Sequence, residues 1–242
     1  MELIVLAALS VAVASIIGGA TGFGTALIAT PLMLMAGIGL AETVAVNLVV
    51  ALITRVGVTV QLRRHITWRR VAVLGAASVP GAWLGVQTLA LLPEQHLQPA
   101  AGAVTVLCGL AMALPTTHHT RPPSTLASAT AGAIGGYLST TTSLNGPPVV
   151  LLLGRAKLPP LGFIGDLAGY FVITSTVSLA LLWTGTGIDL PGLAPLLTVC
   201  TVAGVAANQA GIAIATRLPT HVFRSAVIAL VVIAGLLTIV TA

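Results

Sequence analysis

Charged residues are scarce in this sequence of 242 residues: 6% are Asp, Glu, Lys or Arg, whereas 57% are hydrophobic. A soluble domain carries roughly a quarter charged residues, so this chain has too few to form a water-compatible surface. Apolar runs of about 20 residues, the length that crosses a bilayer as a helix, recur throughout, and the mean hydropathy is +1.08. We therefore predict an all-α polytopic membrane protein with no soluble domain.

Acidic residues and cysteines are particularly few, with five acids and two cysteines in the whole chain. Cys108 and Cys200 each lie in an apolar run without a Cys or His at metal-ligand spacing, so we predict small core residues. A cation or metal carrier needs converging carboxylates or thiolates, and Asp166 is the sole acid within a predicted span. The histidines fall in loops and turns without a catalytic partner. We predict no metal, no cofactor and no enzymatic activity.

The ten basic residues are scattered between the apolar runs, which is a pattern of membrane topology rather than of nucleic-acid binding. Short loops rich in Lys and Arg stay in the cytoplasm, so we place the loop "QLRRHITWRR" inside. Alternation from that loop puts nine of the ten basic residues inside and four of the five acids outside. The prediction is a multi-pass protein of the cell (plasma) membrane whose N-terminus and C-terminus both lie outside.

Glycine, proline and polar residues divide the chain into ten apolar segments in two sets of five. We predict them at 3–18, 22–38, 42–62, 70–91 and 96–114, and at 124–138, 146–155, 161–184, 192–216 and 220–241. The stretch "TTHHTRPPS" separates the sets. The predicted units are a first repeat at 1–115, a cytoplasmic linker at 116–124 and a second repeat at 125–242, all within one membrane domain.

Matching residues indicate that the two sets are copies. Gly18, Gly19 and Pro31 precede Gly135, Gly136 and Pro148 by 117 residues, and the stripe Gly75, Ser78, Ala82, Gly85 precedes Thr201, Gly204, Asn208, Gly211 by 126. The charge alternation requires the first two segments of each set to return the chain to its starting side, so each set crosses an odd number of times. We therefore predict an inverted-topology repeat of two five-segment halves, with broken or re-entrant helices at the first pair of segments in each half.

The interruptions "GGATGFGTALIATP" and "GGYLSTTTSLNGPP" leave segments that are short for a full crossing. At about 1.5 Å per residue the segments 3–18 and 22–38 reach roughly 24 Å, against a hydrocarbon core of about 30 Å. Paired short, broken segments point to the binding site of a transporter. A helix N-terminus exposes unpaired N–H groups and about half a positive charge, so the helices that begin after the interruptions are predicted to form an oxyanion pocket.

The predicted substrate-binding residues lie at the two interruptions and inside neighbouring spans. They are Thr21, Gly22, Gly24, Thr25, Asn47, Arg55, Ser139, Thr140, Thr141, Thr142, Ser143, Asn145, Asn208 and Gln209. The five consecutive hydroxyl residues at 139–143 are costly to bury without partners, which favours contact with a ligand over helix capping. For Asn47, Asn208 and Gln209 two roles stay open, lining of a cavity and hydrogen bonding between helices.

Two ionisable residues, Arg55 and Asp166, fall inside predicted spans, where charges are functional candidates. Three roles stay open for Arg55: contact with the anion or a gate, an ion pair with Asp166, or a side chain that extends to the membrane surface. Asp166 is a candidate for proton coupling, with a position at the lipid headgroups as the alternative.

At these residues the sequence resembles the sulfite exporter TauE/SafE family of membrane permeases. The resemblance rests on "GGATGFGTALIATPLMLMAGI", on "HITWRR" followed by "GAASVPGAWLG", and on "GGYLSTTTSLNGPPVVLLL", and it covers nearly the whole chain. It implies an inverted-repeat permease for sulfite, organosulfonates such as sulfoacetate, or related small anions. Functional positions of the family map onto Gly22, Gly24, Thr25, Pro31, Gly136, Ser139, Gly146 and Pro147. The second block has less glycine than the family usually shows, and Asn47 stands where a Thr-Ser pair is common.

The predicted function is that of a secondary transporter that exports the anion by alternating access. An inside-negative potential drives an anion outward by about 2.3 kcal/mol per charge per 100 mV, so export needs no coupling ion. The alternative is a proton-coupled uptake permease or a channel for related oxyanions. The expected partners are the small anionic substrate, the lipid bilayer and a second copy of the chain in a homodimer, with no nucleic acid.

Overall fold

The computed structural model describes residues 2–91, 94–113, 123–156, 158–186 and 192–215, and the single residues 229, 232, 233 and 236. This part of the chain contains helices and no strand, which confirms the predicted all-α class. The helices are α1 (Glu2–Thr21), α2 (Thr25–Met35), α3 (Leu40–Leu62), α4 (Trp68–Leu91), α5 (Glu94–Ala113), α6 (Thr125–Thr142), α7 (Gly146–Arg155), α8 (Pro160–Thr186) and α9 (Ala194–Ala215). The tenth predicted segment, 220–241, lies almost entirely outside the described residues, as does most of the predicted linker.

Within the described ranges, five helices are long and apolar enough to cross a membrane: α1, α3, α4, α8 and α9. The prediction that the first segment is too short to cross is wrong, because α1 has 20 residues and continues through Gly18 and Gly19. In the same way α6 continues through Gly135 and Gly136 and ends at Thr142. Only the second helix of each pair is short, with 11 residues in α2 and 10 in α7.

The glycine pairs lie inside helices, at points where the backbone of a neighbouring helix comes very close. A Cβ atom on Gly19 would collide with the carbonyl oxygen of Asn208 in α9, and one on Gly136 would collide with that of Ser78 in α4. Small residues allow this close approach between helices in a membrane, where packing and hydrogen bonds drive helix association. These glycines therefore serve packing and do not interrupt the helices.

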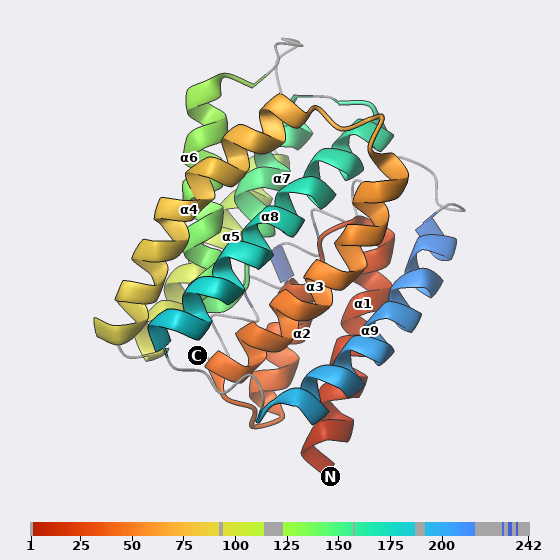
Figure 1. Ribbon diagram of the computed structural model, residues 1–242, viewed down its shortest axis with the longest axis vertical. Coiled ribbons are helices and arrows are strands. Elements are labelled where there is room, and N and C mark those ends of the chain that lie inside the picture. Colours follow the sequence, from red (N-terminus) through yellow and green to blue (C-terminus); the bar gives the residue numbers. More distant parts are fainter. Residues whose placement is uncertain are drawn as a thin grey trace.

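Two tightly packed outer helix pairs flank a central pair. The outer pairs are α4 with α6 and α1 with α9, and the central pair is α3 with α8 (Figure 1). Helix α2 packs on α1 and α3, while α7 packs mainly on α6 and α5. The two junctions between α1 and α2 and between α6 and α7 consequently lie beside the central pair.

Corresponding contacts in the two outer helix pairs are related by constant differences in residue number. Gly81 abuts the carbonyl oxygen of Ala133, and Gly211 abuts that of Ile16; residues 81 and 211 differ by 130, and residues 16 and 133 by 117. The pair Ser78–Gly136 corresponds to Asn208–Gly19 by the same two offsets. The α4 stripe therefore corresponds to the α9 stripe with an offset of 130, one helical turn more than the 126 inferred from sequence.

We expect Gly136→Ala to destabilise the protein by about 1–3 kcal/mol, because the added methyl group would force α4 and α6 apart. Gly57→Ala is the matched control, since a Cβ on Gly57 meets no atom within 4 Å. The measurement is thermal unfolding of the purified protein in detergent. Equal midpoints for the two variants would contradict the assigned role of Gly136.

Candidate functional site

The first junction, residues 22–24, is closed by local hydrogen bonds. Gly22 adopts the left-handed conformation with φ +87°, and its N–H donates to the carbonyl of Gly18 at 2.8 Å, which is a standard glycine stop for a helix. The Thr21 hydroxyl donates to the carbonyl of Ile17 and accepts from the N–H of Gly24 at 3.1 Å. These bonds end α1 and pair the N–H of Gly24, whereas the N-terminus of α2 at Thr25 has no side-chain cap.

Arg55 lies at the first junction. Its side chain is 4% exposed, and Nη2 donates to the carbonyl oxygen of Gly18 at 3.2 Å. Gly18 in turn packs directly against Thr25, the first residue of α2. Gly18 therefore contacts both the guanidinium of Arg55 and the first residue of α2. The guanidinium does not extend to the membrane surface, and it is not paired with Asp166.

The second junction, Ser143–Asn145, depends on residues distant in sequence. Ser143 has φ 60°, the left-handed region, which costs a non-glycine residue about 1–2 kcal/mol. Asn47 of α3 donates from Nδ2 to the hydroxyl oxygens of Ser143 and of Thr30, each at 3.0 Å. The hydroxyls of Thr30 and Ser143 are themselves 3.1 Å apart. This buried cluster, the Asn47 clamp, joins α2, α3 and the end of α6.

The hydroxyl residues 139–142 were predicted to lie at the N-terminus of a new helix. They lie instead in the last turn of α6. Thr141 and Thr142 donate to the carbonyls of Tyr137 and Leu138, four residues earlier. Thr140 donates to the carbonyls of Ala82 and Tyr137. Ser139 accepts from Ser178 at 2.8 Å and from Asn145 at 3.4 Å. Each hydroxyl in this run has a protein partner, so their number does not itself require a ligand.

The two junctions meet in the interior. The side chains of Phe23 and Phe171 both pack at Gly146, the first residue of α7. Gly22, Gly24 and Thr25 come from one side of this contact and Asn145 from the other. Phe23 is 5% exposed, and Thr21, Thr25 and Asn145 are buried, so in this conformation the junctions are closed to solvent.

The N-termini of α2 and α7 differ in their hydrogen-bond donors. Helix α2 begins Thr25-Ala26-Leu27, and each of these residues has a backbone N–H. Helix α7 begins Gly146-Pro147-Pro148, and proline has no N–H. The first junction therefore offers more donors to an anion than the second, an asymmetry that the sequence interpretation did not include.

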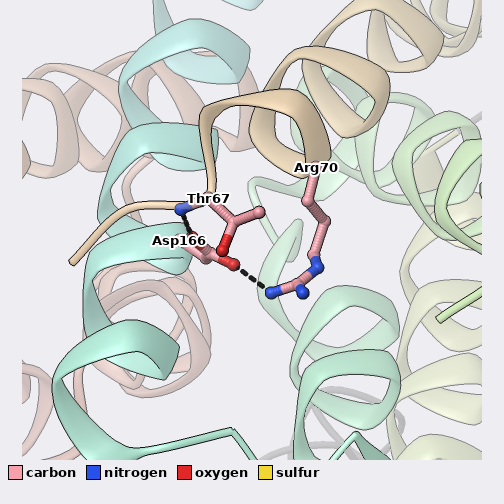
Figure 2. A network of polar contacts seen from close by, with 3 residues as sticks. All are labelled: Thr67, Arg70 and Asp166. Atoms are coloured by element: carbon pink, nitrogen blue, oxygen red, sulfur yellow. Dashed lines mark hydrogen bonds and ion pairs between the residues drawn. The ribbon is translucent and has the colours of Figure 1, made fainter. Parts of the chain in front are cut away.

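Asp166 is fully buried near the start of α8, where its carboxylate forms an ion pair with Arg70 of α4 and accepts from the N–H of Thr67 at 2.7 Å (Figure 2). The candidate Arg55–Asp166 pair is therefore wrong. The reason lies in helix position: Thr67 and Arg70 begin α4 at the end of the bundle where α8 also begins, and Arg55 lies deeper.

Two further residues predicted to bind substrate, Asn208 and Gln209, lie on different faces of α9. Asn208 is buried beside Gly19, and its Oδ1 has no hydrogen-bond partner within the described part of the chain. Gln209 is exposed on another face of α9, away from the junctions. A cavity of about 460 Å³ lies between α5, α6 and α7, and none of the predicted substrate-binding residues lines it.

Sequence reasoning missed several residues that build the junctions. Thr30 completes the Asn47 clamp, Phe23 fills the contact between the junctions, and Arg70 neutralises Asp166. The sequence did offer a signal for Thr30, since it is a polar residue directly before Pro31 in a mainly apolar segment. The partner of Asp166 has no comparable signal, because it is 96 residues away.

Long apolar helices with buried polar residues at their junctions define a polytopic helical membrane protein. Comparison with known proteins specifies which: the chain belongs to the sulfite exporter TauE/SafE family, whose model matches residues 6–238. This is a family of membrane transporters. A curated relative from Cupriavidus necator, named a probable sulfite/organosulfonate exporter TauE, is 31% identical over 172 residues. The match covers 68% of this chain and 66% of the relative, so the chain aligns with just under two thirds of that protein. No solved structure matches.

We expect Asn47→Leu to destabilise the protein by about 1–3 kcal/mol, because it leaves the buried hydroxyls of Thr30 and Ser143 without their shared donor. The matched control is Ser10→Ala, since the exposed Ser10 hydroxyl bonds only its own helix. Denaturant or thermal unfolding in detergent gives the comparison. Wild-type stability of Asn47→Leu would show that the clamp does not hold the second junction.

Proposed function

We propose that this protein exports sulfite or a small organosulfonate, and that the anion binds at the first junction between Arg55 and the N-terminus of α2. The observation that carries the proposal is a buried guanidinium that bonds the carbonyl of Gly18, a residue that packs against Thr25 at the start of α2. A planar guanidinium suits an oxyanion because several of its N–H donors point in fixed directions. Family membership and the name of the relative support the choice of anion.

Arg55 has the electrostatic character that a transient anion site needs. Its hydrogen-bond partner among the described residues is a backbone carbonyl, which accepts a hydrogen bond but does not neutralise the positive charge. The N-terminus of α2 adds partial positive charge and the N–H groups of its first turn. Because the prolines of α7 reduce the donors on the opposite side, we assign the anion to the first junction rather than to both helix tips equally.

Alternating access requires the closed contact between the junctions to open. Phe23 occupies the space between the two junctions, so its displacement would create the path to Arg55. The common offsets of 117 and 130 in the two outer helix pairs support the proposed inverted repeat, since a pseudo-two-fold axis would relate α1 with α6 and α9 with α4. Such repeats provide the two access states of many transporters.

Outward transport without a coupling ion is the direction we propose. The membrane potential favours anion efflux, and the carboxylate of Asp166 already has a cation and a backbone N–H as partners. A carboxylate that links α8 to the start of α4 in this way is suited to a structural role. Proton-coupled uptake through Asp166 is the alternative that the experiments below distinguish.

Arg55→Gln should weaken sulfonate binding by about ten- to a hundredfold, because a hydrogen bond from a charged group contributes about 1.5–3 kcal/mol. Arg69→Gln, at an exposed position of α4, is the control for the loss of one charge. Titration calorimetry with sulfite and with sulfoacetate supplies the affinities. Thr25→Val should also lower affinity, whereas Thr141→Val should not, since Thr141 bonds its own helix. Unchanged binding in Arg55→Gln would remove Arg55 from the site.

Asp166→Asn should leave the pH profile of transport unchanged in reconstituted vesicles while lowering the unfolding temperature, because Arg70 loses its partner. Breaking such a buried pair costs about 3–5 kcal/mol when one charge is left uncompensated, and partial exposure of Arg70 reduces this. The uptake alternative would be established if the wild-type transport rate follows an imposed proton gradient and the rate of Asp166→Asn does not.

A further inference from the structure

A lateral groove lies between α5, α6 and α7, apart from the two junctions. Its volume is about 460 Å³, which is in the range of sites that bind organic ligands. Val104 and Cys108 of α5, Ala131 and Ile134 of α6 and Leu151 of α7 form apolar walls. We call this feature the α5–α6–α7 groove.

One end of the groove is positively charged. Arg155, in the last turn of α7, lines it there, together with Pro123 just before the N-terminus of α6. The start of α6 adds partial positive charge at the same end, while the C-terminal carbonyls of α7 add partial negative charge beside Arg155. Toward the other end the groove reaches Pro148 and Ile134, where charged residues are absent from the walls.

Apolar side chains at the wall of the groove and close to it are exposed on the outside of the described helices. Ile134 is 47% exposed, and Leu107 and Leu110 of α5 are 65% and 52% exposed. These apolar side chains next to the groove would contact lipid tails. The groove is therefore accessible from the bilayer itself.

We propose that the α5–α6–α7 groove binds one anionic phospholipid, with the phosphate at Arg155 and an acyl chain along the apolar walls. From Arg155 to Pro148 the helix rises about 10 Å, which fits within the roughly 15 Å of hydrocarbon in one leaflet. Basic pockets between helices at a membrane surface bind anionic headgroups. A two-carbon sulfonate would leave most of the apolar wall uncovered. The proposal is independent of the anion assigned to Arg55.

The far end of this site is close to the second junction. Pro148 lines the groove and follows Asn145 by three residues. An acyl chain would therefore contact the first turn of α7, next to the contact between Gly146 and Phe23. Occupancy of the groove would restrict movement of α7 and thereby link lipid binding to the proposed opening of the junctions.

Native mass spectrometry of the full chain released from nanodiscs of mixed phosphatidylglycerol and phosphatidylcholine tests the headgroup contact. The wild-type protein should retain phosphatidylglycerol in preference to phosphatidylcholine. Arg155→Gln should reduce that preference about fivefold, as expected for one arginine at an anionic surface, and Arg69→Gln should retain it. No preference in the wild type, or an equal preference in Arg155→Gln, would overturn the proposal.

Cys108 provides a second readout in the wild-type protein. Cys108 lines the groove, whereas Cys200 is fully buried in the core formed mainly by α1, α2, α3 and α9 and serves as the internal reference. Phosphatidylglycerol should slow the modification of Cys108 by N-ethylmaleimide more than phosphatidylcholine does. Glycerol 3-phosphate alone should not. Equal protection by the free headgroup, or protection by ethanesulfonate alone, would identify a small-anion site and contradict the lipid assignment.

Discussion

Helix α3 holds both junctions of the protein. Its Asn47 donates to Ser143 at the second junction, and its Arg55, two turns further along, donates to Gly18 at the first. A helix that ends inside a membrane protein leaves backbone groups that water cannot reach, so the protein must supply their partners. Much of the remaining architecture, including the central position of α3 next to α8, follows from this requirement.

The class of the fold was predictable because it depends on composition and segment length. Most helix bounds were also predicted to within a few residues, since polar loops and prolines mark them. The first pair of segments was predicted less well, because a glycine pair in a membrane sequence has two physical meanings. Gly18-Gly19 and Gly135-Gly136 were interpreted as interruptions, but both pairs permit close helix packing, and α1 and α6 end two and six residues after their pairs.

The candidate site was predicted in part. Proximity of Arg55 to the first interruption, and of Asn47 to the second, could not be read from residue spacing, because both contacts join different helices. The hydroxyl run at 139–142 shows the limit of counting polar residues. A threonine in a helix can bond a carbonyl of its own preceding turn, so a polar stretch in the sequence need not indicate a polar cavity.

The two halves are less alike than the sequence matches indicated. Helix α6 extends one turn further beyond its glycine pair than α1 does, and this extra turn contains the hydroxyl run. It moves the prolines of the second half to the first turn of α7, whereas Pro31 lies in the middle of α2. The first junction therefore has the cation and the fuller set of helix N–H groups, whereas the side-chain donors of the second junction bond one another and its helix begins with prolines.

The carbonyl partner of Arg55 has a kinetic consequence. A guanidinium held by a carboxylate would have to exchange one full negative charge for another before any anion could bind. A carbonyl oxygen carries only a partial charge, so in the proposed site an anion would displace a weaker competitor, and the carbonyl would pair with the guanidinium again once the anion leaves. A carrier needs that reversibility, since tight retention would stop its cycle after a single passage.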